Sequence, residues 1–204
     1  MSAKPQTPLM TVAEYLAHER AAEYKSDYID GRLYPVHDPY RRGDPKAMAG
    51  ASREHNTVQS NLFGELFTRL KACGCRVCGS DQRVRVSPTG RYNYPDIVIV
   101  CEPPQYADDD RDALVNAQVV IEVLSDSTRQ YDRRLKSAGY RQHPTIREII
   151  LVEQREVLVE RYVRQPDGQW TYTAFTDLAA DFEFATIPAR VPMADIYRGV
   201  ELAE

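Results

Sequence analysis

The stretch VVIEVLSDST, residues 119–128, places a glutamate inside a run of apolar side chains. Residues 119–121 and 123–124 are all valine, isoleucine or leucine, a pattern typical of a strand buried on both faces. Glu122 interrupts this run. An unpaired buried carboxylate costs several kcal/mol, so Glu122 requires either a raised pKa or a positively charged partner.

A second apolar strand carries another carboxylate. The segment YPDIVIVC, residues 94–101, begins with Asp96 directly after Pro95. Two carboxylates that converge in one sheet repel each other unless a hard cation neutralises them, and Mg²⁺ is commonly held by one or two carboxylates with water. We therefore predict that Asp96 and Glu122 share a divalent metal ion.

The segment after the Glu122 strand predicts a helix over residues 128–142. Asp132, Lys136 and Tyr140 are spaced four residues apart, so they share one face of this helix. If that face turns toward the strand end, the Lys136 ammonium approaches the metal site. There it can orient or deprotonate an attacking water, or stabilise negative charge on a phosphorus centre.

The remaining elements predict an α/β fold, a mixed β-sheet flanked by helices. Thr11 and Glu14 form a capping-box pattern at the start of a helix, and Asp30-Gly31 indicates a tight hairpin. Ser52 caps a longer helix with apolar residues every four positions. The strand–helix–strand unit over residues 119–153 predicts two parallel strands.

Length and composition favour a single domain spanning residues 1–204. No apolar run approaches the length of a membrane span, and the N-terminus lacks a signal-peptide core, so we expect a cytoplasmic protein without membrane contact. The formal net charge of −4 is unlike that of a protein that coats nucleic acid. Contact with DNA would therefore depend on local basic patches.

The cysteines stand at positions 73, 75, 78 and 101. The segment CGCRVC lacks a fourth ligand nearby and matches no standard zinc spacing. Reduced, mostly buried thiols are the expectation for these residues in a cytoplasmic protein.

These segments resemble a known family. YPD at 94–96, IEVLSDST at 121–128 and YDRRLKSAGY at 131–140 look like the PD-(D/E)xK nuclease superfamily, and more narrowly like the bacterial restriction-endonuclease family Uma-two. The likeness is dispersed over the chain, which makes it more specific than the short PD motif. It extends to the segments KSDYIDGRLYPV, MAGASREHN, CRVCGSDQRVRV, REIILVEQ and VPMADIYRGV.

The resemblance implies a restriction-endonuclease-like core and hydrolysis of DNA phosphodiester bonds. It implies Asp96 and Glu122 as ligands of Mg²⁺ or Mn²⁺, with the backbone carbonyl of Val123 as a further ligand. The superfamily lysine lies two residues after the acid, where this chain has Leu124. In this family it lies on the next helix, which corresponds to Lys136. Such nucleases often act as homodimers, so a homodimer is expected.

Two positions depart from the family pattern. Asp27 stands where the family has a glutamate before the hairpin; the shorter side chain would join the catalytic acids and bind metal through water. The segment HDPYRRGDPK, residues 37–46, looks like a loop insertion that brings Arg41, Arg42 and Lys46 near a substrate or merely decorates the surface.

Several further residues are candidates for substrate binding: His55, Arg133, Arg134 and Tyr140. A structural role for His55 and a solvated face for the arginines are the plain alternatives. At the level of function, the alternatives are a catalytically inactive nuclease-fold module that binds nucleic acid or a protein, and a metal-dependent hydrolase of a small phosphate compound.

Overall fold

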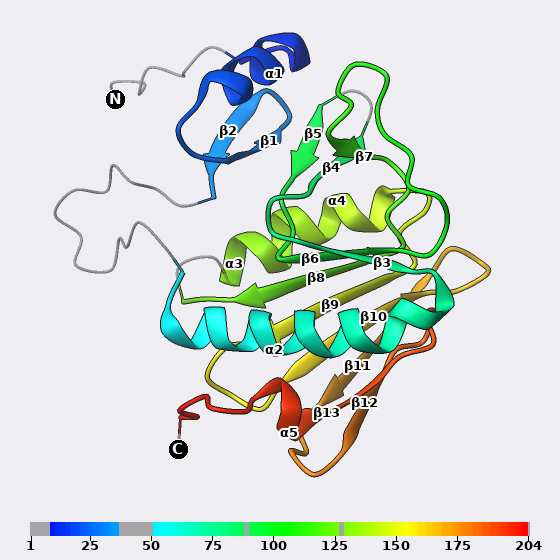
Figure 1. Cartoon of the computed structure of the whole chain (residues 1–204). Coiled ribbons are helices and arrows are strands. Elements are labelled where there is room, and N and C mark those ends of the chain that lie inside the picture. The colour runs from blue at the N-terminus through cyan, green and yellow to red at the C-terminus, as the bar shows by residue number, and fades with distance from the viewer. Residues whose placement is uncertain (1–8, 37–50, 88–89, 127–128, 204) are drawn as a thin grey trace, which may run out of the picture.

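The computed structural model describes residues 9–36, 51–87, 90–126 and 129–203 (Figure 1). The proposed loop insertion at residues 37–46, with its three basic residues, lies outside the described residues. None of the helices in these ranges has the length and apolar composition needed to cross a membrane.

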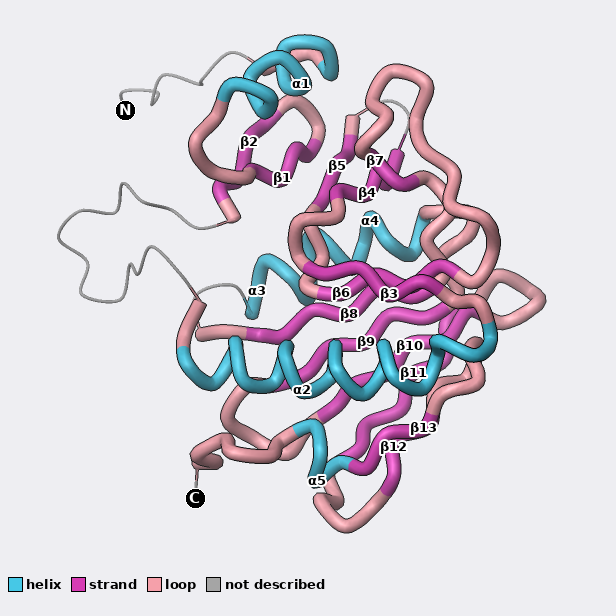
Figure 2. The backbone as a smooth tube through the Cα atoms, in the orientation of Figure 1, coloured by secondary structure: helices cyan, strands magenta, loops and turns pink. Residues whose placement is uncertain are grey.

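The centre of the molecule is a six-stranded mixed sheet. In spatial order its strands are β11 (Trp170–Phe175), β10 (Val159–Arg164), β9 (Glu148–Glu153), β8 (Val119–Leu124), β6 (Ile97–Val100) and β3 (Arg76–Gly79). Strands β8 and β9 are parallel, as predicted from the strand–helix–strand unit, whereas β6 and β8 are antiparallel. The predicted fold class, a mixed sheet flanked by helices, is confirmed (Figure 2).

Helices cover both faces of this sheet (Figure 1). Helix α2 (Arg53–Leu70) packs its apolar stripe against the odd-numbered residues of β6 and β8. On the other face, α4 (Ser137–Gln142) packs Tyr140 against the even-numbered residues of the same strands. Because side chains alternate along a strand, Glu122 belongs to the face that α4 covers.

A second, five-stranded sheet lies beside the first. In spatial order it contains β2 (Arg32–Pro35), β1 (Ser26–Ile29), β5 (Arg91–Asn93), β4 (Arg83–Ser87) and β7 (Ala113–Leu114). The predicted hairpin is confirmed: Asp30 and Gly31 both have positive φ, at 50° and 86°, as a two-residue turn requires.

The remaining elements complete both ends of the chain. The predicted capping box of Thr11 and Glu14 opens α1 (Val12–Ala21), which lies above the second sheet. At the C-terminal end, β12 (Asp181–Glu183), β13 (Arg190–Pro192) and α5 (Met193–Ile196) add apolar side chains to the core on the α2 face.

The predicted helix over residues 128–142 is interrupted. It consists of α3 (Arg129–Tyr131), a π-helical turn η2 (Asp132–Lys136) and α4. Single π-helical turns are rare and occur frequently at functional sites. The turn contains Lys136, so the irregular part of the helix is the part that faces Glu122.

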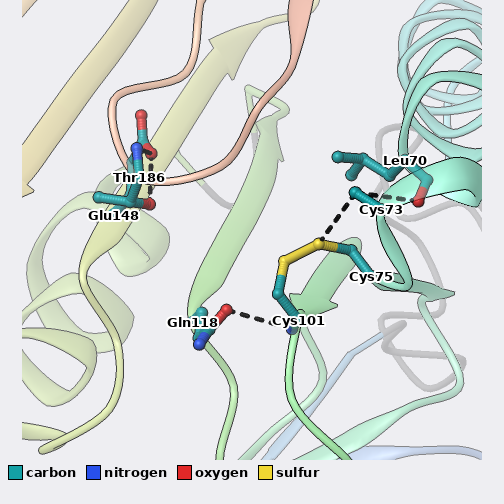
Figure 3. Close-up of a disulfide and its surroundings, with 7 residues drawn as sticks. All are labelled: Leu70, Cys73, Cys75, Cys101, Gln118, Glu148 and Thr186. Carbon is teal, nitrogen blue, oxygen red and sulfur yellow. Dashed lines mark hydrogen bonds between the residues drawn. A yellow bond between two sulfur atoms is a disulfide. The ribbon is translucent and has the colours of Figure 1, made fainter.

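The expectation that all cysteines are reduced and mostly buried is wrong. Cys75 and Cys101 form a disulfide (Figure 3). Of the two free cysteines, Cys73 is exposed and Cys78 is half-buried. The cause is the register of β3 and β6, which pairs Arg76 with Val100 and so places Cys75 opposite Cys101. That register joins cysteines 26 residues apart in sequence, which the spacing of the CGCRVC segment alone does not indicate.

Candidate active site

Adjacent strands bring Asp96 and Glu122 together. The ladder between β6 and β8 pairs Ile97 with Ile121, and Asp96 lies one position beyond this pair, where its cross-strand neighbour is Glu122. The amide of Val123 donates a 2.7 Å hydrogen bond to Oδ2 of Asp96, which holds the Asp96 carboxylate against β8. The two carboxylates therefore stand on neighbouring strands at the same end of the sheet.

Glu122 is only 2% exposed and has two side-chain partners. Nζ of Lys136 lies 3.1 Å from Oε2, and the hydroxyl of Tyr140 donates a 2.6 Å hydrogen bond to Oε1. Burial raises the pKa of Glu122 well above its ordinary value, and the nearby charges of Asp132 and Asp96 raise it further against the opposing effect of Lys136. The surroundings of Glu122 therefore disfavour its ionised form relative to water.

Lys136 lies among three carboxylates. Its Nζ is 3.1 Å from Glu122, 3.3 Å from Asp132 and 3.5 Å from Asp27. Burial alone would lower the pKa of Lys136, but Asp27, Glu122 and Asp132 outweigh this effect and raise the pKa well above its ordinary value. Lys136 is therefore a permanently charged ammonium group, shared by more carboxylates than it can neutralise.

Asp96 is held from the opposite side by α2. Nε2 of His55, in the first turn of that helix, lies 3.2 Å from Oδ2 of Asp96. Burial would raise the pKa of Asp96, but the hydrogen bond and charge of His55, with Lys136 and the Val123 amide, lower it. Reciprocally, burial would lower the pKa of His55, but Asp96 and Asp132 raise it. The contact therefore favours an ion pair between protonated His55 and the Asp96 carboxylate.

Asp27 reaches the site from β1 and is 1% exposed. Oδ1 accepts a 2.7 Å hydrogen bond from the amide of Tyr94, and Oδ2 accepts a 2.9 Å hydrogen bond from the hydroxyl of Tyr131. Tyr94 in turn provides a carbonyl oxygen 3.3 Å from Nζ of Lys136. Asp27 thus ties the second sheet to the helix that carries Lys136.

Three of the substrate-binding candidates differ in where they lie. Tyr140 is fully buried and orients Glu122, so it is not placed to meet a substrate. Arg133 forms ion pairs with Glu153 at 2.7 Å and with Glu160, so its guanidinium group is already bound by carboxylates of β9 and β10. Arg134 is exposed, the placement that contact with a phosphate group requires.

Sequence analysis missed two groups of contacts. The Tyr131 hydroxyl donates a hydrogen bond to Asp27 across 104 positions of sequence. Nζ of Lys136, five residues after Tyr131, lies 5.8 Å from the centre of the Tyr131 ring, a contact that the π-helical turn permits and that four-residue spacing does not indicate. Glu153 and Glu160, the partners of Arg133, lie in strands β9 and β10. Both glutamates stand in apolar runs of the sequence, as Glu122 does, and this pattern could have identified them as buried carboxylates.

The donor chemistry of the site suits a hard divalent cation. Asp96 and Glu122 offer carboxylate oxygens from adjacent strands. Burial, and then its acidic neighbours, raise the pKa of Glu122, so a bound cation would favour the ionised form of this carboxyl group. Among the described residues, no group of three or more histidine, cysteine, aspartate or glutamate side chains is placed to hold one ion. Two carboxylates with water are sufficient for Mg²⁺, so the residues fit this group.

Comparison with known proteins identifies the family. Residues 12–190 match the family model Uma2, whose description is "Putative restriction endonuclease". The chain belongs to the Uma2 family. The family resemblance seen in the sequence is therefore confirmed, over a range that contains every residue of the acidic site.

Curated relatives extend over nearly the whole length of this Uma2 chain. The uncharacterized protein sll1609 of Synechocystis sp. is 32% identical over 179 residues, which is 88% of this chain and 94% of the relative. A second protein of that organism, slr1290, is 28% identical over 95% of this chain and 94% of its own.

A solved structure shares the fold. The crystal structure of a putative nuclease belonging to DUF820, from Anabaena variabilis, superposes with a TM-score of 0.70 at 18% identity. The match covers 92% of this Uma2 chain and 97% of the other. At this identity, the likeness establishes the architecture.

Proposed function

We propose that this Uma2 protein is a metal-dependent endonuclease that hydrolyses phosphodiester bonds in DNA. The observation that carries the proposal is the pair of cross-strand carboxylates, Asp96 and Glu122, in a site with more buried negative charge than Lys136 and His55 can neutralise. The description of the family as restriction endonucleases supports DNA as the substrate.

In this proposal Asp96 and Glu122 hold Mg²⁺ or Mn²⁺, with the carbonyl of Val123 as a further ligand and Asp27 acting through water. When bound there, the cation supplies Lewis-acid stabilisation of the charge on the phosphate oxygens. The site's own hydrogen bonds prepare the ligands: Tyr140 orients Glu122, while His55 and the Val123 amide orient Asp96. Such supporting contacts strongly affect metal affinity.

Lys136 acts in this proposal as a fixed positive charge. Asp27, Glu122 and Asp132 overcome the effect of burial and raise its pKa, so at neutral pH the ammonium has no free lone pair to accept a proton from water. Of the roles expected from the sequence, orienting the reactants and stabilising negative charge therefore fit, and deprotonating the water does not. Attack on phosphorus is in line, without a covalent enzyme intermediate.

DNA contact outside the acidic cluster falls to exposed basic residues. Arg134 is exposed and belongs to the π-helical turn that also carries Lys136, so it is the candidate for contact with a DNA phosphate. The net charge of −4 implies that such contacts are local and weaken with salt. Replacing Arg134 with alanine should reduce DNA cleavage while leaving hydrolysis of a small phosphodiester unchanged.

The decisive experiment is cleavage of supercoiled plasmid and single-stranded DNA with Mg²⁺, Mn²⁺ or EDTA. We expect nicking that requires metal and is lost in Glu122→Ala and Asp96→Asn. Conversion of nicked to linear plasmid would further support a homodimer, because two strands need two sites. Retained cleavage in both variants would contradict the proposal.

Calorimetry with Mn²⁺ distinguishes failure of the site from failure of the substrate. If no DNA is cut but Mn²⁺ binds to the wild type and not to Glu122→Ala, the metal site stands and DNA is the wrong substrate. If Mn²⁺ does not bind either, the catalytically inactive binding module replaces the nuclease proposal.

A further inference from the structure

Three cysteines meet at the end of the central sheet opposite the acidic site (Figure 3). Cys75 directly precedes β3 and Cys101 directly follows β6, and their disulfide links these neighbouring strands. Asp96 stands before β6 and Cys101 stands after it, so the disulfide closes the far end of the strand whose near end carries the proposed metal ligand.

Cys73 lies beside this disulfide as a free thiol. It ends the short 3₁₀ helix η1 (Lys71–Cys73) and is exposed to solvent. Its Sγ is 3.4 Å from Sγ of Cys75 and donates to the carbonyl oxygen of Leu70 at 3.1 Å. Gly74, with a φ of 77°, turns the chain back so that the two sulfur atoms face each other.

We propose that Cys73, Cys75 and Cys101 form a thiol–disulfide exchange site, in which Cys73 attacks the existing disulfide at Cys75. The attacking species in such exchange is the thiolate, and access to the attacked sulfur determines the rate. Cys73 meets both requirements of position: it is open to solvent, which can take its proton, and it touches one sulfur of the disulfide.

The exchange is balanced without an external oxidant. The Cys73 thiol releases its proton to solvent, and its sulfur forms a bond to Sγ of Cys75. The bond between Cys75 and Cys101 breaks, and Cys101 leaves as a thiolate that takes up a proton. One disulfide is replaced by another, so the number of thiols is unchanged.

The exchange alters what the disulfide joins. The bond between Cys75 and Cys101 ties β3 to β6, whereas a bond between Cys73 and Cys75 closes only a loop around Gly74. The freed Cys101 retains the hydrogen bond from its amide to Oε1 of Gln118, at 3.1 Å, which precedes β8. The strand that follows Asp96 thus loses its covalent anchor to β3 and keeps this hydrogen bond.

Disulfide mapping tests this inference without reference to nuclease activity. The full-length protein is incubated in mildly alkaline buffer, quenched in acid to stop exchange, and digested with an acid protease for mass spectrometry. We expect two isomers in the wild type, Cys75 with Cys101 and Cys73 with Cys75, and the same two in the control Cys78→Ser. Only the first should occur in Cys73→Ser.

A second variant tests the contact between Cys73 and Cys75 directly. In Cys101→Ser, checked for folding by circular dichroism, treatment with glutathione disulfide should close a bond between Cys73 and Cys75. A wild type that keeps only the Cys75–Cys101 bond, or that contains four free thiols, overturns the inference. So does a Cys101→Ser protein that carries glutathione on both Cys73 and Cys75.

Discussion

Glu122 and Glu148 occupy neighbouring parallel strands, and both are almost completely buried, at 2% and 0% exposure. Glu148 accepts hydrogen bonds from the amides of Ala185 and Thr186, each at 3.0 Å, and from the Thr186 hydroxyl at 2.7 Å. Figure 3 shows Glu148 beside Thr186. Glu122 instead shares one ammonium group with two other carboxylates.

The difference shows what separates a structural carboxylate from a candidate functional one. The donors around Glu148 come from the loop between β12 and β13, and they serve that carboxylate alone. Around Glu122, acidic side chains converge from three different elements on Lys136, so charge is left over. Burial alone does not indicate function; the balance of charge around the buried group does.

The largest expected effect is a loss of activity in Glu122→Gln, which Glu148→Gln should not show. Glu122→Gln should reduce the proposed nuclease activity by about a hundredfold or more, since it removes a metal ligand. Its free energy of unfolding should stay within about 1 kcal/mol of the wild type, because one charge leaves an acidic cluster. Plasmid nicking and urea denaturation measure the two quantities. Full activity combined with a large loss of stability would place Glu122 among the structural carboxylates.

A third kind of buried carboxylate extends the comparison. Glu153 and Glu160 are neutralised by arginine, and Arg133 contacts both. Arg133→Met should lower the free energy of unfolding by about 3 kcal/mol, because it leaves buried charge with less compensation. The exposed neighbour Arg134 provides the matched control, since Arg134→Met should leave stability unchanged. Equal urea midpoints for the two variants would refute the structural role of Arg133.

Glu148→Gln tests whether Glu148 has a purely structural role. The amide presents a donor where Thr186 already donates, so one buried hydrogen bond is lost and a donor is left unsatisfied. The free energy of unfolding should fall by about 2 kcal/mol, while cleavage at a temperature where the protein is folded should not change. Loss of activity in the folded variant would show that Glu148 influences the site.

The smallest expected effect concerns pH and a group outside the acidic cluster. Burial lowers the pKa of His143 to about 4, so the folded state binds its proton less readily than the unfolded state. Stability is therefore complete above the unfolded pKa and declines as pH falls from about 6.5 toward about 4, by about 2 kcal/mol at about pH 5.

Urea midpoints at neutral and at mildly acidic pH, for the wild type and His143→Gln, isolate this contribution. The variant should lose less stability on acidification than the wild type does. An identical loss in both proteins would show that His143 is not the group that titrates.

Local patterns in the sequence predict the central strands and several residues that the structure brings together in the candidate site. Glu122 stands out because it interrupts an apolar run, and four-residue spacing places Lys136 and Tyr140 on one face of the predicted helix. The direction of Arg133 was not predictable, since it depends on carboxylates in strands that fold against the helix. Only tertiary contacts decide such orientations.

The same limit applies to the cysteines. The disulfide depends on the register between β3 and β6, and that register is fixed by the core rather than by the spacing of cysteines. Sequence patterns report which residues share an element; the pairing of distant elements follows from how the whole chain packs.

Because of the π-helical turn, the geometry of the candidate site depends on the number of residues between α3 and α4. A π-helical turn contains more residues than an α-helical turn, so the chain between α3 and α4 has more residues than a regular helix of the same length would need. Removing a residue such as the exposed Leu135 would restore regular helix and turn Lys136 and Tyr140 together relative to Asp132 and Tyr131. Within this segment, single-residue deletions should therefore reduce activity more than most substitutions do.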